Sequence, residues 1–88
     1  MTAKRAHRTI IELGNPADHP LRVWIEPWAE EVAITAGERW HIICDSPECC
    51  PITIDIDDGC VVFYGPSKST VRVFRGKDLA WECYAPAP

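Results

Sequence analysis

The fold class is decided by residues 52–64, which read ITIDIDDGCVVFY. The dipeptide Asp58-Gly59 tolerates the positive φ angles of a type I′ turn, and the residues on both sides of it alternate between apolar and polar. If these two residues form the loop, Asp57 pairs with Cys60 and the pairs further out follow in step. The apolar side chains then share one face: Ile52, Ile54, Ile56, Val61 and Phe63. A slip of one residue would mix the two faces, so we predict an antiparallel hairpin in this register, with one apolar face.

The same alternation, with a period of two residues, recurs along the rest of the chain. Predicted strands cover residues 8–13, 21–26, 31–35, 38–44, 70–75 and 79–84. In the last of these strands, Leu79, Trp81 and Cys83 are expected on one side. Turn-forming Gly, Pro, Asn and Asp residues separate the strands, and no helical pattern persists beyond one turn. Seven or eight short strands with this spacing predict an all-β fold: an antiparallel β-sandwich or small barrel, jelly-roll-like in its arrangement.

Length and charge restrict the class of protein. The chain has 88 residues, a mass of 9.9 kDa and a formal charge of −4. We predict a single β-sandwich domain over residues 1–88, frayed at residues 1–7 and 85–88. The acidic balance argues against a nucleic-acid partner, and no apolar run approaches the roughly 20 residues that span a bilayer. The basic N-terminus lacks the long apolar segment of a signal peptide, which predicts a cytoplasmic protein.

Motifs for catalysis are missing from the sequence. The chain is too short for the large α/β enzyme folds, and it carries no local nucleophile motif. Asp55 and Asp57 do not match a calcium-binding loop and are explained as the solvated face of the hairpin. We therefore expect no enzymatic activity and no cofactor.

The strongest functional signal is a pair of tryptophans around Pro27. The alternation places Trp24 on the outer face of its strand, and Trp28 follows just beyond the proline break. Tryptophan is enriched at protein interfaces, so we predict a non-catalytic interaction module that self-associates, most simply as a homodimer. The predicted binding residues are Arg22, Trp24, Glu26, Trp28 and Glu30. Two alternatives stay open: a small ligand that stacks on the rings, or Trp28 as a plug over one end of the sandwich.

The cysteines offer a different function. Their number is five, so complete pairing within the chain is excluded. Cys44, Cys49 and Cys50 concentrate around one loop with His41 nearby, although the spacing lacks the paired CxxC rhythm of a structural zinc site. His41 and Cys44 differ by three positions, which points them to opposite faces of a strand. A thiol or zinc site in this loop is the alternative function, and inert cysteines are the simpler interpretation.

A third alternative depends on charge. Glu26, Glu30, Glu31 and Glu38 form an acidic group in the sequence. Such a group is typical of an acidic inhibitor or immunity-type protein that covers a basic partner surface, and also of an ordinary solvated face.

One segment carries a resemblance. Residues 15–28, with Asn15-Pro16 at the start and Glu26-Pro27-Trp28 at the end, are followed by an Ala-Gly turn. This pattern resembles small uncharacterised bacterial proteins, which implies a bacterial, intracellular source and no particular activity. The strand–Gly-Glu–strand rhythm is also similar to that of cupin and cupredoxin sandwiches. Their metal-binding patterns are missing here, so this second likeness concerns architecture alone.

Overall fold

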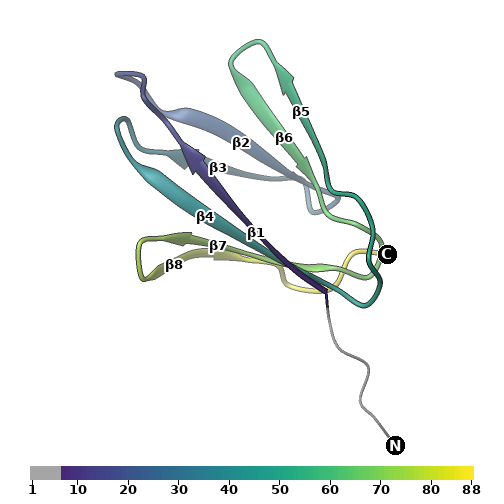
Figure 1. Cartoon of the computed structure of the whole chain (residues 1–88). Coiled ribbons are helices and arrows are strands. Elements are labelled where there is room, and N and C mark those ends of the chain that lie inside the picture. The colour runs from purple at the N-terminus through teal and green to yellow at the C-terminus, as the bar shows by residue number, and fades with distance from the viewer. Residues whose placement is uncertain (1–6) are drawn as a thin grey trace, which may run out of the picture.

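The computed structural model describes residues 7–88, which form eight β-strands (Figure 1). The strands are β1 (His7–Gly14), β2 (Leu21–Glu26), β3 (Glu30–Ile34), β4 (Arg39–Ser46), β5 (Thr53–Asp57), β6 (Cys60–Tyr64), β7 (Thr70–Arg75) and β8 (Asp78–Glu82). They build two four-stranded sheets: sheet A in the order β1-β4-β7-β8 and sheet B in the order β3-β2-β6-β5. The described residues contain no helix that is long and apolar enough to cross a membrane. The predicted all-β fold of seven or eight short strands is confirmed, with eight strands present among the described residues.

The hairpin of β5 and β6 has the predicted register. Asp57 lies opposite Cys60, and the remaining pairs follow in step as far as Thr53 and Tyr64. Asp58 and Gly59 both have positive φ angles, 44° and 74°, as a type I′ turn requires.

The apolar face of this hairpin is only partly buried. Val61 and Phe63 of β6 belong to the core, whereas Ile54 and Ile56 of β5 are 38% and 81% exposed. The reason is position: β5 is the edge strand of sheet B, and the opposite sheet does not cover it. An alternating pattern predicts which residues share an apolar face of a strand. It does not predict how far the opposite sheet extends over that face.

One strand pair differs from the antiparallel prediction. β2 and β6 are parallel neighbours, with Trp24 opposite Val62. Parallel strands need a long connection, and here β3, β4 and β5 lie between the two in sequence. The pairing also brings the residues that follow β2 and β6 to the same end of the sheet.

The core lies between the two sheets. Its buried apolar side chains are Val23, Ile25, Trp28, Ile34, Trp40, Ile42, Cys44, Val61, Phe63, Val71, Val73 and Ala87. These residues come mainly from β2 and β6 of sheet B and from β4 and β7 of sheet A. In each of these strands they alternate with outward residues, as a sandwich core requires.

Trp28 closes the end of the sandwich where β2 and β6 finish. Its ring is 8% exposed and meets Trp81 edge to face at 5.9 Å between centroids. The indole Nε1–H donates a hydrogen bond to the carbonyl oxygen of Ala85 at 2.7 Å. Trp28 is therefore the plug that one of the sequence alternatives described, and the expectation that it is an exposed anchor is wrong.

The C-terminal segment is held in place. Ala87 is 4% exposed, and its backbone N–H and carbonyl bond to Ser69 and Lys68, each at 2.8 Å. The segment ends beside the loop that leaves β6 (Figure 1). The prediction that residues 85–88 fray is wrong, because their partners lie far away in sequence and give no local signal. Of the predicted frayed start, His7 belongs to β1, and residues 1–6 lie outside the described residues.

The last strand is irregular. A shift in the β7–β8 register places Trp81 opposite Val73 but Leu79 opposite Phe74. Trp81 therefore packs against the core, while Leu79 is 49% exposed. The expected common side for Leu79, Trp81 and Cys83 is wrong at Leu79, because the irregularity breaks the alternation.

Gly65 packs closely against the ring of Trp28, and this contact predicts how a substitution there affects stability. A Cβ added at Gly65 would lie 2.7 Å from Cζ3 of Trp28 and 2.9 Å from Oγ of Ser69. We expect Gly65→Ala to lower the free energy of unfolding by about 1–3 kcal/mol, since a well-packed site must open. Urea denaturation measures the change.

The control variant is Gly14→Ala. A Cβ there meets its nearest neighbour, the Arg39 side chain, at an ordinary 3.5 Å. We expect this variant to stay within about 0.5 kcal/mol of the wild type. Equal losses for the two variants would contradict the close packing of Trp28 on Gly65.

Candidate functional site

The outer face of sheet B carries an aromatic and apolar centre. Val23 and Ile25 of β2 point into the core, so Trp24 lies on the opposite side, half-buried. The strand registers place Val62 of β6 beside Trp24, and Tyr64 of β6 lies on the same face. We call this surface the Trp24 face.

Charged side chains surround that centre. The registers put Glu31 on one side of Trp24 and, beyond Val62, Asp55 on the other. Among residues 7–88, the charged residues on the Trp24 face are Arg22, Glu26, Glu31, Asp55 and Asp57. Four carboxylates and one guanidinium give this face a formal charge of −3.

Arg22 is held between an acid and the indole ring. Its Nε and Nη2 donate to the two carboxylate oxygens of Glu31 at 2.9 and 3.2 Å. The guanidinium carbon lies 5.9 Å from the centre of the Trp24 ring. The hydrogen bond from Arg22 lowers the pKa of Glu31. Because the pair is exposed, it adds little to the stability of the fold. Its main effect is to hold the Arg22 guanidinium in place beside the Trp24 ring.

The outer face of sheet A offers the comparison. Its acids and bases are equal in number: Arg8, Arg39 and Arg72 against Glu12, Asp45 and Glu82. Most of them form ion pairs, such as Arg8 with Asp45 at 2.7 Å and Arg39 with Glu12 at 2.9 Å. Sheet A thus presents a balanced surface, and sheet B an acidic surface around a tryptophan.

The structure brings together only part of the predicted binding set. Arg22, Trp24 and Glu26 share the Trp24 face, whereas Trp28 is buried. Glu30 is exposed but lies opposite Ile25 in the register, on the inner side of the sheet.

The predicted acidic group is also divided. Glu38 accepts hydrogen bonds from Trp40 and Arg75 beside sheet A. It therefore lies apart from Glu26 and Glu31. The acids that join them, Asp55 and Asp57, were missed because the parallel β2–β6 pairing has no local sequence signal.

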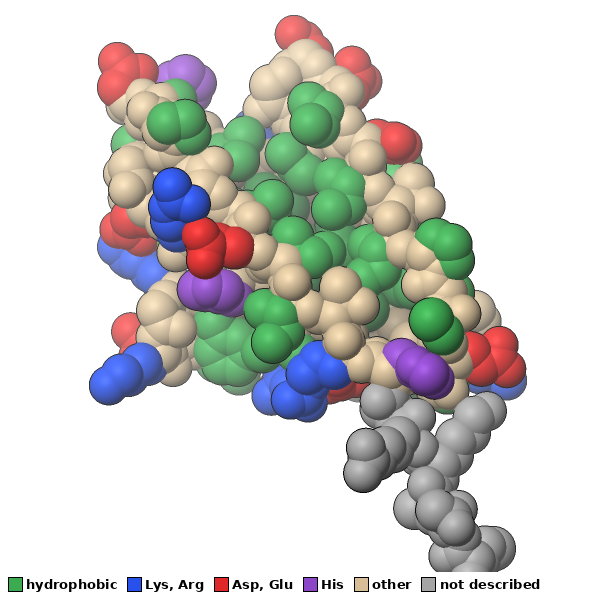
Figure 2. Space-filling model, viewed as in Figure 1, with side chains coloured by type: hydrophobic (Ala, Val, Ile, Leu, Met, Phe, Trp, Pro, Cys, Tyr) green, Lys and Arg blue, Asp and Glu red, His purple; other side chains and the backbone are tan. Residues whose placement is uncertain are grey.

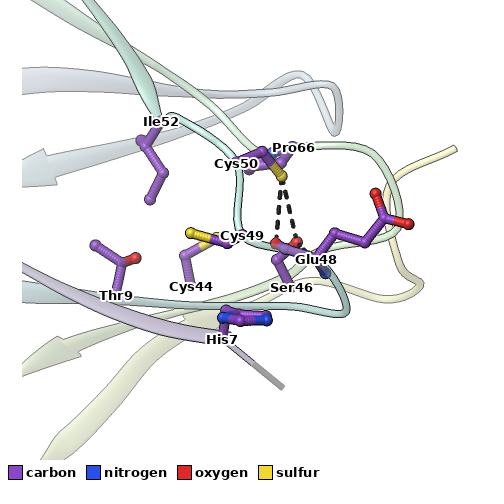
Figure 3. A pocket seen from close by; sticks show the side chains of 9 residues that line it. All are labelled: His7, Thr9, Cys44, Ser46, Glu48, Cys49, Cys50, Ile52 and Pro66. Atoms are coloured by element: carbon purple, nitrogen blue, oxygen red, sulfur yellow. Dashed lines mark hydrogen bonds between the residues drawn. The ribbon is translucent and has the colours of Figure 1, made fainter. Parts of the chain in front are cut away.

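The cysteine loop forms a small cavity (Figure 3). It is lined by His7, Thr9, Cys44, Ser46, Glu48, Cys49, Cys50, Ile52 and Pro66 and has a volume of about 40 Å³. This volume is enough for ordered water. Within it, the Cys50 thiol lies 3.6 Å from Oγ of Ser46 and donates to the Glu48 carbonyl oxygen at 3.4 Å.

The predicted metal ligands do not converge. Cys44, Cys49 and Cys50 share the cavity, but His41 lies on the outer face of sheet A, 3.3 Å from Glu12. His7 lines the cavity instead. Within residues 7–88, no three His, Cys, Asp or Glu side chains are grouped closely enough to hold a metal ion. The described part of the chain therefore offers thiols at this cavity and no formed metal centre.

The three thiols differ in accessibility. Cys44 is buried, and burial raises the pKa of its thiol. Cys49 and Cys50 are exposed. Since the thiolate is the reactive form, Cys44 is the inert member of the group.

This difference predicts the order of thiol modification. In the folded protein, an aromatic disulfide reagent should react first with Cys49 and Cys50, and with Cys44 only as fast as the protein opens. Absorbance of the released thiol measures both phases. Cys49→Ser and Cys50→Ser should each remove one fast equivalent, and a fast phase that persists in the double variant but disappears in Cys44→Ser would contradict the assignment.

Comparison with protein-family models, with curated proteins and with solved structures finds no match to this chain.

Proposed function

We propose that this protein is a non-catalytic interaction module that binds a partner protein through the Trp24 face. The observation that carries the proposal is the partly exposed indole of Trp24 at the centre of an acidic sheet surface. Interfaces commonly combine an aromatic anchor with a charged rim, where the anchor supplies affinity and the rim supplies specificity and encounter rate. The groups on this face suit recognition: a flat ring, apolar side chains and carboxylates.

The charge of the face favours a basic partner over a second copy. Two Trp24 faces packed on each other would bring four carboxylates of one copy against four of the other, and like charges across an interface cost affinity. Arg22 is the one base on the described part of this face that can form an ion pair with a carboxylate of the other copy. It already donates two hydrogen bonds to Glu31 of its own chain. A partner surface with several Lys or Arg side chains around an apolar patch complements the face without this conflict. The homodimer expected from the sequence is thus the less favoured occupant.

Trp24→Ala tests the proposal. Sheet A holds a matched control, Phe74, whose ring lies 5.6 Å from the Arg72 guanidinium on the outer face. We expect the immobilised wild type to retain a basic protein from cell extract, and Trp24→Ala to weaken that complex about 30-fold, as removal of a hot-spot residue does. Phe74→Ala should change the affinity by less than about threefold. Isothermal titration with the purified retained protein gives the affinities.

Salt and self-association provide the controls. About 1 M salt, where the Debye length is about 3 Å, should release the partner. The proposal fails if Phe74→Ala weakens the complex as much as Trp24→Ala does. It also fails if every basic protein that the wild type retains is retained equally by Trp24→Ala. Sedimentation of the wild type alone should show a monomer. If the wild type is instead a dimer and Trp24→Ala is a monomer, the Trp24 face binds a second copy of the chain.

A further inference from the structure

The free edge of β5 is an open site for strand pairing. β5 is the last strand of sheet B, and all five of its residues are exposed. Its register with β6 is regular, and its sequence contains no proline, lysine or arginine. Prolines, lysines and bulges are among the devices that protect edge strands, and β5 has none of them. Within residues 7–88, the backbone N–H and carbonyl groups on the free side of β5 have no partner strand. β8, an edge strand of sheet A, is in contrast irregular in its pairing.

The inner side of β5 is apolar and uncovered. Ile56 is 81% exposed and Ile54 38%, although they share a face with the buried Val61 and Phe63. Figure 2 shows apolar side chains gathered in a hollow between the two sheets, on the side where β1 and β5 are the edge strands. Half-buried Ile11 of β1 packs against the core from the other side. The exposed isoleucines of β5 therefore continue an apolar surface that residues 7–88 leave open.

The outer side of β5 is acidic. Asp55 and Asp57 are exposed, and among residues 7–88 neither has an ion-pair partner. Five arginines of the described chain already pair with other carboxylates. The edge therefore combines a free backbone, an apolar inner side and an unneutralised acidic outer side.

We propose that β5 accepts an extended segment of a partner protein as an added strand, with basic side chains on its outer side and apolar side chains on its inner side. In an added strand, successive side chains point to opposite faces of the sheet. The basic residues would meet Asp55 and Asp57, and the apolar residues would cover Ile54 and Ile56. The β5 strand of a second copy fits poorly, because pairing the two centrally places Asp55 opposite Asp55. The inference goes beyond the proposed function and does not depend on it, since Trp24 lies two strands away from the free edge.

A designed peptide tests the added strand. The probe is a short synthetic peptide of alternating lysine and valine, and its controls are the same residues in two blocks and a peptide of alternating glutamate and valine. We expect the alternating basic peptide to bind about tenfold or more tightly than either control, measured by fluorescence anisotropy. Hydrogen exchange of the complex should show new protection in residues 53–57.

Variants locate the peptide on the protein. Ile56→Lys places a cation on the inner side of β5 and should weaken binding about tenfold. Its matched control is Ile10→Lys, at a residue that is 61% exposed on the outer face of sheet A, and it should leave binding unchanged. Both positions are exposed, so both variants should fold.

Three results would overturn the proposal. Equal binding of the block peptide would show attraction by charge without strand pairing, and equal binding of the acidic peptide would remove the role of Asp55 and Asp57. A loss caused by Trp24→Ala but not by Ile56→Lys would place the peptide on the Trp24 face. That last result would overturn the added strand while leaving the proposed function intact.

Discussion

Apolar contact between the central strands of the two sheets holds this chain together. Inward residues of β2 and β6 meet those of β4 and β7, and burial of such side chains is the main favourable term in folding. With 88 residues the chain can extend this contact only so far. At one end, Trp28 and the C-terminal segment complete it, whereas along the side bordered by β1 and β5 the apolar surface stays open. The exposure of Ile54 and Ile56 on the inner side of β5 follows from this limit.

The outer faces of the two sheets differ in charge. On sheet A, ion pairs such as Arg8 with Asp45 neutralise the outer face. On the outer face of sheet B, the described residues include one arginine and four carboxylates, and Arg22 pairs with Glu31 alone. The other acids lie around Trp24 and along β5. An acidic field of this kind accelerates encounter with a basic partner, and the apolar groups within it retain that partner once water is excluded. Asp55 belongs to the Trp24 face and to the edge strand, so the two surfaces are continuous in charge.

Features set by neighbours in sequence were predictable, and features set by distant partners were not. The Asp58-Gly59 turn and the alternation beside it determine the hairpin register, and β2 and β7 occupy the predicted residues. The outward position of Trp24 followed from the same alternation. In contrast, the parallel β2–β6 pair joins segments that β3, β4 and β5 separate, and no turn signals it. The burial of Trp28 depends on Gly65 and on the carbonyl of Ala85, and the exposure of Ile56 depends on where the opposite sheet ends.

The most direct test of the Trp24 face is the nuclear magnetic resonance spectrum of the indole N–H groups. The chain has four tryptophans, and the indole N–H groups of Trp28 and Trp40 are hydrogen-bonded to Ala85 and Glu38. During titration with the retained basic protein, the signal that Trp24→Phe removes should shift or broaden, while those of Trp28 and Trp40 stay in place. Movement confined to the signal of Trp40, or no movement of the Trp24 signal at saturation, would contradict binding through this face.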